Sequence, residues 1–116
     1  NFITNIGEKN LKDFDKICGQ FIGLIMFQNK GLNDLKDFFR KIFYETSKES
    51  NPLNPNVPFE QSTLTNFLQG MIMNGHKIKA IPIENGWLEF DTVKDLEIYN
   101  KMLTNNTLSD FINIQD

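Results

Sequence analysis

Two carboxylates, Glu89 and Asp91, close an aromatic-rich stretch of the sequence just before a helix should begin. The stretch reads GWLEFDTVKDLEIYNKML and covers residues 86–103. On a strand, side chains two residues apart project from the same face, so these carboxylates should repel one another unless a cation or a basic side chain lies between them. Mg²⁺ takes such oxygen ligands, usually one or two carboxylates together with substrate phosphates. Two interpretations stay open: a magnesium site, or an Asp bonded to helix amides beside a Glu paired with a lysine.

The helix that follows has its own cap, which bears on the role of Asp91. The hydroxyl of Thr92 can accept a hydrogen bond from the first free amides, and Asp95, three residues on, completes a capping box. Asp91 is therefore not needed as the cap. It would lie at the carboxyl end of a strand, which is where ligands bind in open α/β sheets.

The elements that must position these residues alternate along the chain. Apolar periodicity predicts helices over 31–48 and 62–75, with Ser62 or Thr63 capping the second, and a third helix from Thr92. Residues 49–58 hold three prolines and read as a loop. The segments predicted as strands are 1–6, 21–27, 76–83 and 87–90, with 21–27 apolar throughout and so expected to be buried on both faces. The sequence therefore predicts an α/β domain with about four strands and three helices, and its sheet should be one half of a larger one.

Composition narrows the class of protein. The 116 residues suffice for one domain, and a net charge of −3 without a basic patch argues against nucleic-acid binding. The longest apolar stretch, Phe21 to Phe27, is too short to span a bilayer. Cys18 stands alone, which excludes an internal disulfide and favours a cytoplasmic setting.

Three segments together resemble the small nucleotidyltransferases that act on phosphocholine, sugar phosphates and related phosphorylated alcohols. The 86–103 stretch is similar to the closing motif of that family, an aromatic residue, Glu, an apolar residue, Asp, and Thr or Ser. The upstream GQFIGLIMFQNKG is similar to the segment that lines the acceptor site, although many relatives carry Glu where Gln20 stands. STLTNFLQGMIMNGHKIKAIPI is similar to the family's helix, glycine turn and strand.

The resemblance implies a partial Rossmann-like, GT-A-like mixed sheet, the C-terminal half of a nucleotidyltransferase domain. It implies that Asp91, with Glu89, holds Mg²⁺, and that a nucleotidyl group, CMP being the commonest, passes from a nucleoside triphosphate to a phosphorylated acceptor with release of pyrophosphate. The residues that it places at the substrates are Gly19, Gln20, Gly23 and Trp87.

The family's glycine-rich loop for the triphosphate is absent from these residues, so this chain alone should be inactive. The alternative for Trp87, and the more ordinary one, is a plain core role. The aromatic helix over residues 32–43 should form part of the core or the face of a homo-oligomer. The alternative function is a non-catalytic α/β binding or regulatory domain in which both carboxylates are structural.

Overall fold

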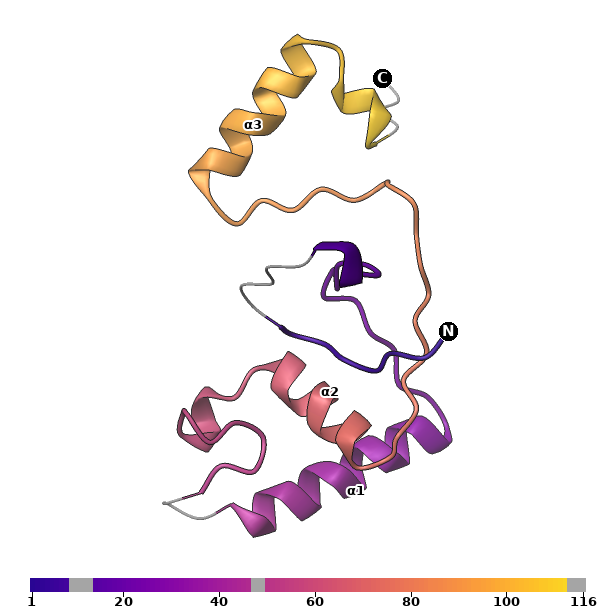
Figure 1. Cartoon of the computed structure of the whole chain (residues 1–116), viewed down its shortest axis with the longest axis vertical. Coiled ribbons are helices and arrows are strands. Elements are labelled where there is room, and N and C mark those ends of the chain that lie inside the picture. Colours follow the sequence, from indigo (N-terminus) through magenta and orange to yellow (C-terminus); the bar gives the residue numbers. More distant parts are fainter. Residues whose placement is uncertain (9–13, 47–49, 113–116) are drawn as a thin grey trace. The chain divides into compact units, whose positions relative to one another are not determined.

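The computed structural model describes residues 1–8, 14–46 and 50–112, and those residues form three α-helices and three short 3-10 helices (Figure 1). The α-helices are α1 (Lys30–Glu45), α2 (Leu64–Met73) and α3 (Val93–Thr104). The 3-10 helices are η1 (Phe14–Lys16), η2 (Phe59–Gln61) and η3 (Leu108–Asp110). The chain divides into two units, Asn1–Ala80 and Ile81–Asp116.

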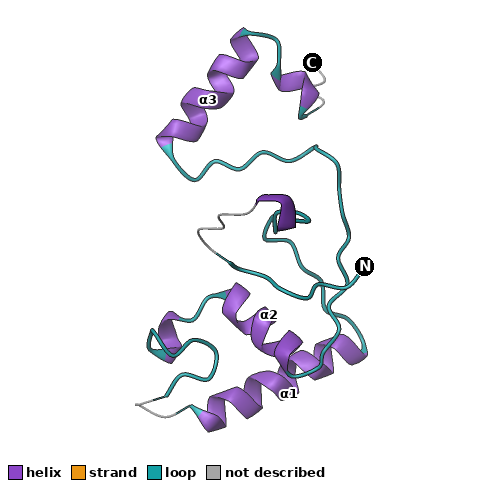
Figure 2. Cartoon of the chain, viewed as in Figure 1, coloured by secondary structure: helices purple, strands orange, loops and turns teal. Residues whose placement is uncertain are grey.

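The predicted α/β sheet is wrong, because the described residues contain no strand (Figure 2). What forms is one antiparallel bridge between Phe2 and Lys79. Two backbone hydrogen bonds flank it, from Ile3 N to the Ile78 carbonyl at 2.9 Å and from Ala80 N to the Asn1 carbonyl at 3.0 Å. The Rossmann-like, GT-A-like architecture that the resemblance implied is therefore not what this chain adopts.

The reason lies in strand pairing. An extended segment becomes a strand only when a neighbouring backbone satisfies its N–H and C=O groups. The apolar run 21–27 makes no such ladder with the described part of the chain, and Leu24 and Met26 are exposed rather than buried on both faces. The apolar composition of this run predicted that it would be buried, but composition does not show whether a neighbouring backbone is present to pair with it.

The three helices are where the sequence predicts them. The Thr63 hydroxyl accepts from Asn66 N at 3.3 Å while Asn66 Oδ1 accepts from Thr63 N at 3.1 Å, a capping box that begins α2. At the other end of α2, Gly75 has a φ of +86°, a left-handed conformation that glycine adopts without a Cβ clash. Gly75 N donates to the Ile72 carbonyl and His76 N to the Met71 carbonyl, which together close the helix.

The core of the first unit lies between α1 and α2. Phe38 and Ile42 of α1 pack with Met71 of α2, each less than 5% exposed, and Leu68 is fully buried. Partly buried apolar residues surround this cluster: Phe27, Leu35, Leu53, Phe59, Phe67 and Ile78. Burial of these side chains is the main source of stability for the unit.

Gly70 sets how closely the two helices approach. A Cβ added there would lie 2.8 Å from Leu53 Cδ2 and 3.2 Å from Phe38 Cζ. Glycine is a poor residue for a helix interior, so its presence at this position is explained by the packing that it permits and not by helix propensity.

The loop before η2 is fixed by one buried polar side chain. Asn51 is 7% exposed, and its Oδ1 accepts from Leu53 N at 3.0 Å and from Asn54 N at 3.3 Å. Its Nδ2 donates to the Val57 carbonyl at 3.0 Å and to Ser62 Oγ at 2.8 Å. With every polar atom satisfied, burial of this amide stabilises the loop instead of costing free energy.

The second unit, Ile81–Asp116, buries little of its apolar surface. An extended run leads to α3, and a turn at Asn85 and Gly86, both with positive φ, is held to η3. Asn85 Nδ2 donates to the Asp110 carbonyl at 2.9 Å, and Gly86 N donates to the Phe111 carbonyl. Large apolar residues of this unit that remain exposed are Ile81, Ile83, Trp87, Phe90, Val93, Leu96, Ile98, Leu103 and Phe111. None of the helices described here has the length and apolar composition needed to cross a bilayer.

We expect Gly70→Ala to destabilise the first unit. Overpacking of a core costs about 1–3 kcal/mol, which outweighs the gain of up to ~1 kcal/mol in helix propensity. Gly31→Ala is the matched control, because an added Cβ there meets no atom within 4 Å. Denaturant unfolding of both variants checks the prediction, and equal stabilisation by the two substitutions would contradict it.

We expect Asn51→Asp to cost about 1–3 kcal/mol of unfolding free energy at neutral pH. The carboxylate would keep the two acceptor contacts but would present an oxygen to the Val57 carbonyl, leaving buried groups unsatisfied. Asn54→Asp is the control, since Asn54 Oδ1 only accepts, from Asn56 N at 3.1 Å, and a carboxylate does the same. The same loss in both variants would show that the added charge matters and the Asn51 network does not.

Candidate functional site

The predicted carboxylate pair lies in the extended run that leads into α3. Asp91 is exposed, and no hydrogen bond to its carboxylate is made by the residues that the structure describes. Glu89 is half-buried and does have an interaction partner. The two carboxylates therefore differ in environment, with Asp91 the one open to a ligand from solvent.

The cap of α3 confirms that Asp91 is not the capping residue. Thr92 Oγ1 accepts from Asp95 N at 3.3 Å, and Asp95 Oδ2 accepts from Thr92 N at 2.7 Å. Thr92 Oγ1 also donates to Asp95 Oδ2 at 2.7 Å, and Asp91 N reaches the same oxygen at 3.2 Å. The Asp95 carboxylate is thus bonded to the start of the helix, and the Asp91 carboxylate takes no part in the cap.

These hydrogen bonds shift the ionisation of Asp95. The Thr92 hydroxyl, and then the Thr92 backbone amide, lower the pKa of the Asp95 carboxyl from its ordinary value of 3.8, because both stabilise the charged form. A carboxylate in the first turn also interacts favourably with the positive end of the helix dipole.

The residues predicted to contact substrates are all accessible. Gly19, Gln20 and Gly23 lie in an exposed segment, where Gly23 has a φ of +83° and an added Cβ at either glycine would meet nothing within 4 Å. The Trp87 side chain is 43% exposed, so Trp87 is not buried in a core of the described structure. Their roles at a substrate stay predictions.

The acidic pair matches the donor chemistry that Mg²⁺ requires, but only in part. Asp91 and Glu89 supply oxygen atoms, the ligands that hard cations take. No cluster of three or more His, Cys, Asp or Glu side chains suited to a metal ion occurs within the described ranges. Any magnesium held by Asp91 and Glu89 would need further oxygen ligands, such as substrate phosphates.

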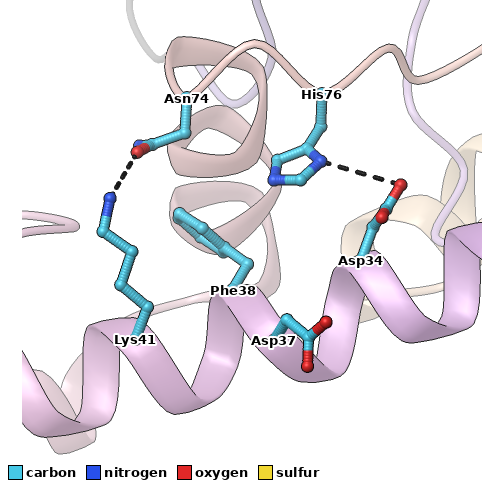
Figure 3. Close-up of a pocket in the computed structure, with 6 residues that line it drawn as sticks. All are labelled: Asp34, Asp37, Phe38, Lys41, Asn74 and His76. Atoms are coloured by element: carbon cyan, nitrogen blue, oxygen red, sulfur yellow. Dashed lines mark hydrogen bonds and ion pairs between the residues drawn. The ribbon is translucent and has the colours of Figure 1, made fainter.

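A second polar site lies in the first unit, where α1 passes the carboxyl end of α2 (Figure 3). A hollow of about 360 Å³ opens there. Phe38 forms its apolar wall, and the polar residues that line it are Asp34, Asp37, Lys41, Asn74 and His76. The glycine turn after α2 places His76 in this hollow, with its ring edge-on to Phe38 at 5.9 Å between centroids.

Ion pairs and hydrogen bonds tie the rim of the hollow together. Asp34 accepts from Lys30 Nζ at 2.6 and 2.7 Å, and its Oδ2 lies 3.9 Å from His76 Nδ1, an ion pair when the imidazole is protonated. Lys41 Nζ donates to Asn74 Oδ1 at 3.0 Å, and this contact links α1 to the cap of α2. The sequence alone did not indicate His76 as a site residue, because the chain has no second His and no pair of Cys with which His76 could bind zinc. One sequence pattern could have indicated this hollow: three of its charged residues, Asp34, Asp37 and Lys41, are spaced three and four apart and so lie along one side of a helix.

Comparison with known proteins links the chain to nucleotidyltransferases. Over 97 residues, 84% of this chain, the sequence is 31% identical to the CTP:phosphoglutamine cytidylyltransferase of Campylobacter jejuni. The matched region is 36% of that relative, so the chain spans about a third of its length. No protein-family profile matches the chain, and no solved structure matches it. The similarity supports the nucleotidyltransferase class that the three segments together resemble.

We expect Thr92→Ala to raise the pKa of Asp95 toward its ordinary value, because the largest cause of the shift is removed. The cap loss should also cost about 1 kcal/mol of helix stability. Since the folded pKa is depressed, the contribution of ionised Asp95 to α3 is present above the ordinary value of 3.8 and is lost as the pH falls through the folded pKa. A carboxyl NMR titration and helical circular dichroism between about pH 6 and pH 2 measure both effects.

Two controls isolate the cap. Thr104→Ala removes a hydroxyl from the last turn of α3, where it donates only to the Asn100 carbonyl at 2.9 Å, and should leave the Asp95 titration unchanged. Asp95→Asn should flatten the acid-induced loss of helix. If Thr92→Ala leaves the Asp95 pKa where it was, the capping box does not control the ionisation.

Proposed function

We propose that this chain is the C-terminal part of a magnesium-dependent cytidylyltransferase. In the complete protein, an oxygen of a phosphorylated acceptor attacks the α-phosphorus of CTP, CMP is transferred and pyrophosphate leaves. The observation that carries the proposal is the 31% identity over 97 residues to a cytidylyltransferase. The acceptor that we propose is a small phosphorylated molecule, with phosphorylated alcohols, sugar phosphates and phosphorylated amino-acid amides as the classes to test.

The reaction requires charge neutralisation and in-line positioning more than it requires protein acids or bases. Mg²⁺ would screen the charge of the two reacting phosphates. We assign its carboxylate ligands to Asp91, with Glu89 assisting. The exposure of the Asp91 carboxylate supports this assignment, as does the fact that Thr92 and Asp95 have taken over the capping of α3.

The apolar surface of the second unit supports the view that more of the protein is needed. Units of fewer than about 40 residues seldom build a sufficient core of their own. Leu108 is the one large apolar residue of the described part of this unit that is buried, whereas Phe90, Val93 and Leu103 are each more than half exposed. We propose that other parts of a nucleotidyltransferase domain cover this surface. We also propose that Gly19, Gln20 and Gly23 of the first unit contact substrates, and that Trp87 of the second unit does so.

We expect Asp91→Asn to lower CMP transfer by the complete protein by about 100-fold or more, because the charge that holds the cation is lost. Unfolding free energy should stay within about 0.5 kcal/mol of the parent, since Asp91 is exposed. Glu89→Gln should weaken transfer less. Pyrophosphate release with CTP, Mg²⁺ and each acceptor class measures the effect.

Asp110→Asn is the matched control, because it removes an equal charge from an exposed carboxylate of the same unit. It should leave transfer unchanged. Loss of stability in Asp91→Asn with full transfer by the folded fraction would make Asp91 structural, and the absence of any CTP-dependent pyrophosphate release would favour a non-catalytic domain.

A further inference from the structure

An apolar groove of about 380 Å³ opens in the first unit between α1, η2 and the start of α2. Apolar side chains from all three elements line it: Leu35, Phe39, Phe59, Leu64 and Phe67. Of these, Phe39 and Leu64 are each nearly half exposed. An exposed apolar surface with polar residues around it is typical of a site where another molecule associates.

The groove continues into a stripe of exposed apolar side chains along α1. Leu32, Phe39 and Phe43 are 38%, 48% and 58% exposed, and their spacing along the helix places them on one side of it. The rings of Phe39 and Phe43 stack with 6.1 Å between centroids, and Phe39 also lies 6.2 Å from Phe67. The groove and the stripe share Phe39 and form one continuous surface, called the apolar face below.

The two edges of the apolar face carry opposite charges. Helix positions three and four beyond Leu32 fall on opposite sides of it, so Leu35 lines the groove while Lys36 lies on the other edge. Glu60, on η2, borders the groove on the side away from Lys36. Both side chains are exposed, and neither makes an ion pair with the residues that the structure describes. One edge of the face therefore presents a cation and the opposite edge an anion.

We propose that a second copy of this chain covers the apolar face, in a two-fold symmetric dimer. A two-fold axis that lies in the interface and runs along α1 keeps the two α1 helices parallel and exchanges the edges of the face. Lys36 of each copy then meets Glu60 of the other, so the same ion pair forms twice. The inference goes beyond the proposed nucleotidyl transfer and does not depend on it.

The apolar residues supply the affinity of this dimer, and the charges set its geometry. With the axis along α1, the exposed rings of Phe39 and Phe43 lie over the groove of the other copy. Aromatic residues are enriched at the centres of protein interfaces, where charged residues are depleted. Exposed ion pairs at the rim add little affinity, but they disfavour the arrangement with antiparallel α1 helices, in which Lys36 would face Lys36.

The test of the apolar contact is the oligomeric state of the 116-residue chain, measured by analytical ultracentrifugation as its concentration is raised. We expect a reversible monomer–dimer equilibrium. Phe43→Gln should raise the dissociation constant at least about tenfold, because an aromatic ring is lost from the centre of the interface. Tyr44→Gln is the matched control, since the next residue of a helix points about 100° away and Tyr44 is 84% exposed. Phe90→Gln, which removes an exposed ring from the second unit, should also leave the equilibrium unchanged.

A charge swap tests the geometry. Lys36→Glu and Glu60→Lys should each raise the dissociation constant about fivefold, since each places like charges opposite one another at both rims. The double variant should restore the parent value, and this recovery cannot come from a variant that fails to fold. Lys79→Glu reverses an exposed charge of the same unit outside the apolar face and should have no effect.

Three results would overturn the proposal. The first is a chain that stays monomeric up to about 1 mM. The second is a dimer that is lost in Phe90→Gln and kept in Phe43→Gln, which would place the contact in the second unit. The third is a double charge variant that associates no better than either single variant.

Discussion

The contact between the Phe38 ring and Gly70 is the constraint on which the rest of the first unit depends. Because Gly70 has no side chain, α2 can approach α1 closely enough for Phe38 to be 3% exposed. The same ring stacks edge-on against Phe67 at 5.1 Å and against His76 at 5.9 Å. One aromatic side chain therefore joins the core to the polar hollow, and a shift in the helix crossing would move both.

The second unit is organised by hydrogen bonds at its turns and caps more than by a core. Thr92 and Asp95 start α3, and Asn85 and Gly86 bind the backbone of Asp110 and Phe111. Such contacts fix local geometry, but each contributes only about 1 kcal/mol net. Many apolar residues of this unit stay exposed, because the other described residues of the unit do not cover them.

Local sequence signals predicted the helices and their caps, and failed where structure depends on partners. The Thr63 and Thr92 caps and the Gly75 turn follow from chemistry within a few residues, so the sequence contains all that determines them. The strands at 1–6, 21–27, 76–83 and 87–90 depended on a neighbouring backbone, and the described residues supply only the Phe2–Lys79 bridge. The hollow escaped prediction for the same reason, since it is created when the helix crossing brings His76 to Asp34.

The start of α3 contains two aspartates in different environments, one bonded to the helix and one exposed. Two aspartates lie within five residues, and a helix N-terminus attracts either of them. The Thr92 hydroxyl and amide both bond to Asp95, which commits that carboxylate to the helix and lowers its pKa. Asp91 contributes its backbone amide to the same oxygen, so its backbone is fixed while its carboxylate stays exposed. This arrangement supports the proposal that Asp91 binds a cation that arrives with the substrate, because the backbone is already fixed and only the side chain is left to be ordered on binding.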